Sequence, residues 1–255
     1  MKEQTIFNSI LITSFFLAVL VFVTLLFIAA PYGRHIRRGW GPTINNKIGW
    51  VIMEAPAPLV FAACFVLGSY TNSITMLVFF GLWEVHYLHR AFIYPLGLRS
   101  SVKNVSLLVM GSGLLFNAVN SYLNGRYLFT FSDSEGYASE WLRDPRFIIG
   151  LVLFIAGFII NRQADSTLRH LRQPCESGYK IPQGGLYRWI SCPNYLGEIV
   201  TWVGWAIATW SLPGLAFAIW TAANLAPRAY SHHIWYQKNF SDYPIERKAL
   251  VPGLW

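Results

Sequence analysis

Seven long apolar runs constrain this chain more than any other feature. A helix needs about 20 mostly apolar residues to cross a bilayer's hydrocarbon core, and runs near that length recur along the whole sequence. They cover residues 6–30, 50–70, 74–94, 106–123, 147–163, 194–211 and 212–230. Because a lipid-exposed segment must satisfy its own backbone groups, we predict an all-α, polytopic membrane protein with seven transmembrane helices. No stretch is left for a soluble domain, so we expect one integral membrane domain over residues 1–255.

The basic residues predict how the chain is oriented. Sixteen of the 20 Lys and Arg fall in connections that an odd number of spans places on one side, and such an excess marks the cytoplasmic face. We therefore expect the N-terminus outside and the C-terminus in the cytoplasm, in a bacterial inner membrane or the endoplasmic reticulum. The net charge of +8 then reflects orientation, and no nucleic-acid partner is expected. The three cysteines lack metal-ligand spacing, so neither a disulfide framework nor a metal site is expected.

Glu54 lies within an apolar run, where ionisable residues are costly and often functional. The second and third runs are joined by residues 71–73 alone, so their helices must be antiparallel neighbours. The helical rise puts Glu54 about 24 Å and Tyr87 about 21 Å from that turn. A neutral carboxylic acid beside a tyrosine hydroxyl could polarise a carbonyl oxygen and stabilise an enolate; a structural bond between helices explains the pair equally well. Pro56 predicts a kink just past Glu54.

Polar residues also gather at the cytoplasmic edge of three predicted helices and in one loop. They are Asn161, Asp165, Arg169 and Arg172, then Tyr179 and Lys180 in the loop, Asn194 and Glu198, and finally Arg228, His232 and Tyr236. Guanidinium groups suit phosphate, although Asp165 and Arg169 could instead form a surface ion pair. The pattern predicts a cytoplasm-facing pocket for a large anionic ligand, reaching inward towards Glu54 and Tyr87. A nucleotide cofactor fits, held without a G-x-G-x-x-G or P-loop motif.

These residues and their neighbours, taken in chain order, resemble steroid 5α-reductases, in particular the mammalian type 2 enzyme and its bacterial relatives. The likeness is carried by Glu54, H-Y-L-H-R at 86–90, N-x-x-x-D-x-x-L-R-x-L-R at 161–172, Y-K-I-P-Q-G-G-L at 179–186, P-N-Y-L-G-E at 193–198, R-x-x-x-H-H-x-W-Y at 228–236 and D-Y-P at 242–244. It implies NADPH-dependent reduction of the Δ4 double bond of 3-oxo-Δ4-steroids. Tyr87 and Glu54 would bind the C3 oxygen, hydride would add at C5, and a proton at C4.

The resemblance also implies site residues. The cofactor-binding set would be the cytoplasmic residues named above, with Arg172 and Lys180 as phosphate contacts. The substrate pocket would include Tyr32, Met53, Glu84, Arg90 and Tyr94, and the substrate would be a steroid or related lipid from the bilayer, with no obligate protein partner. One departure is Met53, because the mammalian type 2 pattern has Gln immediately before the glutamate. That change leaves the preferred steroid open.

Other functions remain possible at this point. The C-terminal half also resembles sterol C14-type reductases and isoprenylcysteine carboxyl methyltransferases. The methyltransferases tend to carry a Glu-Glu pair where this chain has His232 and His233, and they give no reason for Glu54 and Tyr87. A sterol sensor or transporter would explain a cavity but not the cytoplasmic polar residues. A reductase of another enone lipid, such as a polyprenol or an enoyl thioester, would use the same chemistry.

Overall fold

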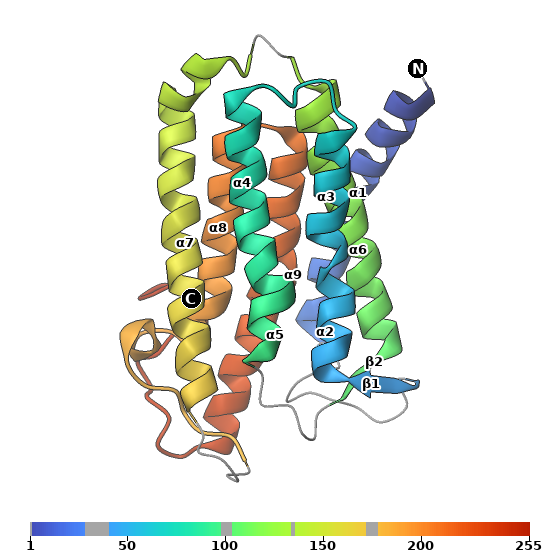
Figure 1. Cartoon of the computed structure of the whole chain (residues 1–255). Helices are drawn as coiled ribbons and strands as arrows, with labels where there is room; N and C mark the ends of the chain where they lie inside the picture. The colour runs from blue at the N-terminus through green and yellow to red at the C-terminus, as the bar shows by residue number, and fades with distance from the viewer. Residues whose placement is uncertain (1, 29–40, 98–103, 134–135, 172–177) are drawn as a thin grey trace. The chain divides into compact units, whose positions relative to one another are not determined.

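The structure is a computed structural model that describes residues 2–28, 41–97, 104–133, 136–171 and 178–255 (Figure 1). Helices cover the predicted apolar runs within these ranges. The α-helices are α1 (Lys2–Phe27), α2 (Asn46–Glu54), α3 (Pro56–Val66), α4 (Ile74–Leu88), α5 (Tyr94–Leu96), α6 (Leu107–Arg126), α7 (Pro145–His170), α8 (Pro193–Thr209) and α9 (Leu212–Asn239). Short π-helical and 3-10 turns accompany them: η2 (His89–Ile93), η3 (Tyr127–Phe131), η4 (Ser139–Arg143) and η5 (Gly185–Arg188).

A short β ladder corrects the all-α prediction. Strands β1 (Thr43–Asn45) and β2 (Asn104–Ser106) pair antiparallel, with Ile44 opposite Val105. The pairing is followed at once by helices α2 and α6, whose first turns are capped by the side chains of Asn45 and Ser106. The fold is otherwise mostly helical. Among the residues that the structure describes, three helical stretches are apolar and long enough to cross a membrane: Lys2–Phe27, Asn46–Val66 and Pro145–His170.

The chain forms two compact units. One unit comprises Met1–Ala30 and Ile149–Trp255, and the other comprises Pro31–Ile148. The predicted Glu54–Tyr87 pair falls in the second unit. The cofactor residues predicted between 161 and 236 fall in the first.

Proline breaks the second apolar run, as predicted. Helix α2 ends at Glu54, Ala55 interrupts the helical assignment, and α3 begins at Pro56. An aromatic cluster then holds α3 in the unit 31–148: Phe61 stacks on Trp83 of α4 at 4.4 Å and meets Phe129 edge-on at 5.0 Å. The Trp83 indole also donates to the Ala57 carbonyl at 3.2 Å. Helices α3 and α4 are thereby fixed on either side of the turn at 71–73.

In the other unit, glycines let α7 and α8 pack backbone to backbone. A Cβ added at Gly157 would lie 2.4 Å from the Thr201 nitrogen, and one at Gly197 would lie 2.4 Å from the Asn161 nitrogen. Gly150 and Gly204 form an equivalent contact two turns away. Small residues at helix contacts are how membrane helices approach closely. The contact at Gly197 lies beside Asn161, the first residue of the predicted cofactor set.

The C-terminal segment braces the start of α8. Ser191 and Cys192 donate from their backbone nitrogens to the carbonyls of Lys248 and Ala249, at 2.8 and 3.2 Å. The Ser191 hydroxyl meets His233 Nδ1 of α9 at 2.7 Å. Arg247 is buried, and its Nη1 donates to the Pro182 carbonyl at 3.2 Å. The loop at 178–186 and the first turn of α8 are therefore tied to the same segment.

Candidate active site

Glu54 is buried and faces polar groups from two other helical segments. Glu54 is the last residue of α2, and 6% of the residue is exposed. Asn117 of α6 donates from Nδ2 to Glu54 Oε2 at 3.3 Å. Arg90 places Nε 3.6 Å from Glu54 Oε1. The carboxyl group therefore has a polar neighbour at each oxygen.

Arg90 reaches Glu54 from a π-helical turn. The turn η2 follows α4 directly, and π turns are often found at functional sites. The Trp50 indole donates to the Arg90 carbonyl at 3.0 Å, and the Arg90 guanidinium lies 5.4 Å from the Trp50 ring centre. Tyr94 also packs against Trp50, with ring centroids 5.0 Å apart. Arg90 and Tyr94, both predicted as substrate contacts, thus belong to one cluster beside Glu54.

Tyr87 is buried in α4, with 3% of the residue exposed. Its ring packs against Trp83 at 4.9 Å and against His86 at 5.1 Å. The neighbouring Glu84 has a buried Oε1 without a hydrogen-bond partner in the described part of the chain. The pairing of Tyr87 with Glu54 on a substrate oxygen stays a prediction.

Two predicted substrate-pocket residues remain, Met53 and Tyr32. Met53 packs against α6: a Cβ built at Gly113 would come 2.5 Å from Met53 Cγ and Sδ. Tyr32 lies outside the described residues.

Sequence reasoning missed the polar face of α6. Asn117, Asn120, Ser121 and Asn124 are all buried, and their spacing of three and four residues puts them on one side of the helix. Buried amides in an apolar helix are costly unless they have partners. The repeated Asn within the run 106–123 was the signal that could have identified this face.

On the cofactor side, four predicted residues form one hydrogen-bonded network. Asn161 donates from Nδ2 to Glu198 Oε2 at 3.0 Å and to the Asn194 carbonyl at 2.9 Å. The Asn194 amide donates to Asp165 Oδ1 at 3.2 Å. Trp202, which was not predicted, donates to the other Glu198 oxygen at 3.0 Å. The structure therefore brings together residues of α7 and α8 that are 29 to 37 positions apart in sequence.

Helix α9 joins through Tyr195, another residue that was not predicted. Arg228 donates from Nη2 to the Tyr195 hydroxyl at 2.9 Å, and that hydroxyl lies 3.2 Å from His232 Nε2. The Arg228 guanidinium also lies 5.0 Å from the Tyr195 ring centre. Because Tyr195 follows Asn194 directly, the motif at 193–198 turns successive side chains towards α7 and α9. One tyrosine thus links two predicted cofactor residues.

The other cofactor candidates differ in their surroundings. Tyr179 meets Trp235 of α9 edge-on, with ring centroids 5.0 Å apart, whereas Lys180 is exposed. Tyr236 is buried and stacks on Tyr243 at 5.3 Å. Two further candidates remain. Arg169 has a buried Nε without a hydrogen-bond partner within the described ranges, and Arg172 lies outside them.

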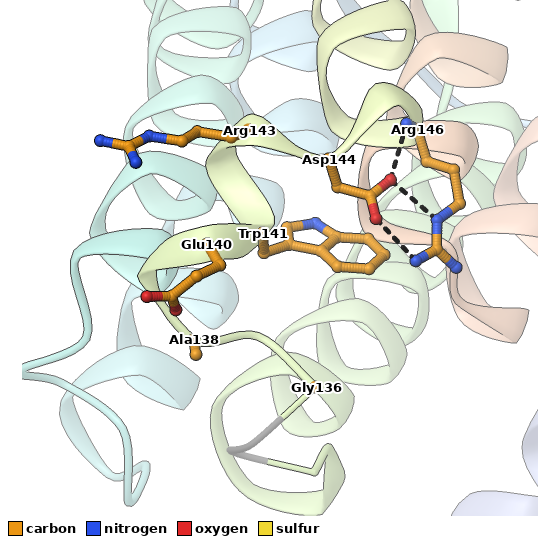
Figure 2. A pocket seen from close by; sticks show the side chains of 7 residues that line it. All are labelled: Gly136, Ala138, Glu140, Trp141, Arg143, Asp144 and Arg146. Carbon is orange, nitrogen blue, oxygen red and sulfur yellow. Dashed lines mark hydrogen bonds and ion pairs between the residues drawn. The ribbon is translucent and has the colours of Figure 1, made fainter.

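A separate hollow opens before α7, in the unit 31–148 (Figure 2). Its volume is about 420 Å³, and it is lined by Gly136, Ala138, Glu140, Trp141, Arg143, Asp144 and Arg146. Arg146 donates from Nε and Nη2 to the two Asp144 oxygens at 2.9 and 2.8 Å, and its backbone nitrogen donates at 2.8 Å. These bonds hold the pKa of Asp144 at about 2, below the ordinary 3.8. The hollow shares no residue with either predicted site.

Comparison with known proteins identifies the family. The family model described as 3-oxo-5-alpha-steroid 4-dehydrogenase matches residues 103–255. The chain is 39% identical to steroid 5-alpha-reductase DET2 of Gossypium hirsutum, over 100% of this chain and 99% of the relative. It is 38% identical to 3-oxo-5-alpha-steroid 4-dehydrogenase 1 of Bos taurus, over 93% of each, and 41% identical to the Homo sapiens protein of that name, over 88% of this chain and 85% of the relative. The chain belongs to the steroid 5α-reductase family.

Proposed function

We propose that this protein catalyses the NADPH-dependent reduction of the Δ4 double bond of 3-oxo-Δ4-steroids to 5α-3-oxosteroids. The observation that carries the proposal is a buried carboxyl group, Glu54, at the end of an apolar helix of a chain that is similar over its whole length to steroid 5-alpha-reductases. A steroid enters such a site from the bilayer because it is itself apolar. Its ketone oxygen then needs a polar protein group inside the membrane with which to form a hydrogen bond.

In this mechanism Tyr87 and Glu54 act on the C3 oxygen. Donors placed where negative charge develops stabilise an enolate more in a dry site than in water. The polarised enone becomes electron-poor at C5. NADPH, when bound, supplies the hydride that C5 accepts, and the enolate then takes a proton at C4. The C4–C5 double bond is thus replaced by two new C–H bonds.

The proposed cofactor residues fit a nicotinamide dinucleotide phosphate. Asn161, Asp165, Asn194 and Glu198 would hold polar groups of the cofactor, together with Arg228, His232, Tyr236 and Tyr179. The Nε of half-buried Arg169, which is buried and has no hydrogen-bond partner within the described part of the chain, suits an anionic oxygen, because a buried polar group is costly without a partner. Arg172 and Lys180 are proposed to contact phosphate, including the 2′-phosphate that distinguishes NADPH from NADH. These assignments supply binding and orientation; the residue that donates the C4 proton is left unassigned.

We further propose a multi-pass arrangement in a bacterial inner membrane or the endoplasmic reticulum. It has seven spans, an outer N-terminus and a cytoplasmic C-terminus, within a single integral membrane domain. The three long apolar helical stretches and the distribution of basic residues support it. Cysteine-accessibility labelling of positions in the connections between helices tests the orientation.

The test of activity uses purified protein in detergent with NADPH and testosterone, progesterone or androstenedione. We expect the 5α-reduced steroid as product, identified by mass spectrometry and retention against both 5-epimers. Polyprenol and enoyl thioester substrates are assayed in parallel, because a reductase of those lipids would use the same chemistry. Binding of S-adenosylmethionine without reduction of any enone would replace this proposal with a methyltransferase.

A further inference from the structure

Asn117 bonds to two consecutive residues at the end of α2. Its Nδ2 donates to the Met53 carbonyl at 2.9 Å and to Glu54 Oε2 at 3.3 Å. The residue is buried, with 6% exposed, and it comes from α6, 63 residues along the chain from Glu54. One amide therefore contacts both the backbone and the carboxyl group of the site.

The Met53 carbonyl shows which end of the amide faces Glu54. A carbonyl oxygen can only accept hydrogen bonds, so the atom 2.9 Å away from it must be the NH₂ group. The reversed amide would place two carbonyl oxygens against each other. The same NH₂ group faces Oε2, which must therefore accept. Asn117 thus distinguishes two carboxyl oxygens that are otherwise equivalent.

Arg90 approaches the other oxygen in a different way. Its Nε lies 3.6 Å from Oε1, which is longer than an ordinary N–H···O hydrogen bond. Asn117, by contrast, gives Oε2 a directed donor.

The end of α2 needs such a brace because its own hydrogen bonding is interrupted. Proline has no backbone N–H, so Pro56 and Pro58 cannot bond to the carbonyls of Ile52 and Glu54, four residues before each. An outside donor at Met53 partly replaces the missing helical restraint. Gly113, one turn before Asn117, allows α6 close enough, since the Met53 side chain fills the space where a Cβ would be.

We propose that Asn117 is a positioning residue for the reaction: by donating from one Nδ2 to Oε2 and to the Met53 carbonyl, it fixes the orientation of the Glu54 carboxyl group relative to the backbone of α2. The proposal rests on the function proposed above. A carboxyl group that is free to rotate would be misaligned with the substrate ketone for part of the time. Misplacement of a catalytic group at a reacting centre lowers the reaction rate strongly. Asn117 itself is not proposed to contact the substrate.

The experiment compares Asn117→Leu with Asn117→Gln, which keeps an amide donor, and with a matched control, Asn124→Leu. Asn124 is also buried in α6, but its amide donates to the Asn120 carbonyl and Oδ1, at 3.0 and 3.2 Å. Steroid kcat and KM are measured on full-length protein in detergent, and NADPH binding serves as the check of folding. We expect Asn117→Leu to lower kcat about tenfold or more, with KM and NADPH binding changed less than about twofold. Asn117→Gln should recover part of the loss, and Asn124→Leu should leave kcat near that of the wild type.

A spectroscopic measurement covers the case in which Asn117→Leu yields no active protein. The infrared carboxyl band of Glu54 is identified as the band that Glu54→Gln removes, and it is followed in Asn117→Ala and Asn124→Leu. Loss of the donor at Oε2 should shift this band in Asn117→Ala alone. An unshifted band, or equal kcat losses in Asn117→Leu and Asn124→Leu, overturns the proposal. A wild-type protein that reduces no enone refutes the proposed function instead, while the band shift still reports the contact between Asn117 and Glu54.

Discussion

Replacing Gly197 by alanine should separate α7 from α8 and weaken NADPH binding. The new Cβ would lie 2.4 Å from the Asn161 nitrogen, 2.7 Å from the Gly157 carbonyl oxygen and 2.9 Å from Asn161 Cα. All three are backbone atoms of α7, so no side chain can turn aside. Ordinary contact begins at 3.4 Å, so the helices must move apart locally by about 1 Å.

That displacement acts directly on the proposed cofactor network. Asn161 bonds to Glu198 at 3.0 Å and to the Asn194 carbonyl at 2.9 Å, and an added 1 Å puts both beyond hydrogen-bonding range. Each lost bond costs about 1 kcal/mol, more where a buried group is left unpaired. Overpacking adds about 1–3 kcal/mol of instability. We therefore expect NADPH affinity to fall by about one to two orders of magnitude, together with a lower melting temperature.

The assay is NADPH fluorescence on detergent-purified protein, paired with a thermal melt. Gly111→Ala is the matched control, because Gly111 is also helical, in α6, and a Cβ there meets nothing within 4 Å. That change should be neutral or slightly stabilising, since alanine favours helix over glycine by about 1 kcal/mol. If Gly197→Ala binds NADPH and melts like the wild type, the tight contact between α7 and α8 is not what positions Asn161.

Three further outcomes are expected. Glu54→Gln and Tyr87→Phe should each lose steroid turnover and keep NADPH binding, measured by product analysis and fluorescence; activity in both variants would refute the dyad. Arg172→Ala should raise the Kd for NADPH far more than that for NADH, and an equal rise would move the 2′-phosphate contact elsewhere. Asp144→Asn should lower the melting temperature at neutral pH, because the depressed pKa of Asp144 contributes stability above its ordinary value of 3.8 that is lost towards pH 2. The difference from wild type should shrink from pH 5 to pH 3, and a constant difference would show that the ion pair to Arg146 does not contribute.

Local sequence patterns predicted the helices and the break after Glu54 because both depend on nearby residues. Apolar runs of sufficient length leave few alternatives to helix, and proline removes donors at fixed positions. The ladder between β1 and β2 was missed because it pairs residues about 60 positions apart, and three residues give no readable alternation. The π turn at Arg90 was also missed, since it differs from an α-helix only in its hydrogen bonds.

In the candidate site, too, local spacing predicted some features, and contacts between helices determined the others. Asn161 and Asp165, like Asn194 and Glu198, are four residues apart, a spacing that puts each pair on one helix face. It could not show that the two faces bond to each other, because that depends on the approach of α7 to α8 at Gly157 and Gly197. Tyr195 was missed for the same reason. Its partners, Arg228 and His232, belong to another helix.

Met53 marks a point that position-by-position comparison alone does not reach. The mammalian type 2 pattern has glutamine immediately before the glutamate, where this chain has methionine, and the effect of that change on the preferred steroid stays a prediction. The structure shows an amide beside Glu54 all the same, supplied by Asn117 of α6. The methionine side chain instead fills the space over Gly113, so it supports the approach that lets Asn117 reach the carboxyl group. The chemistry of the site therefore depends on which helix supplies an amide as much as on the residue next to the glutamate.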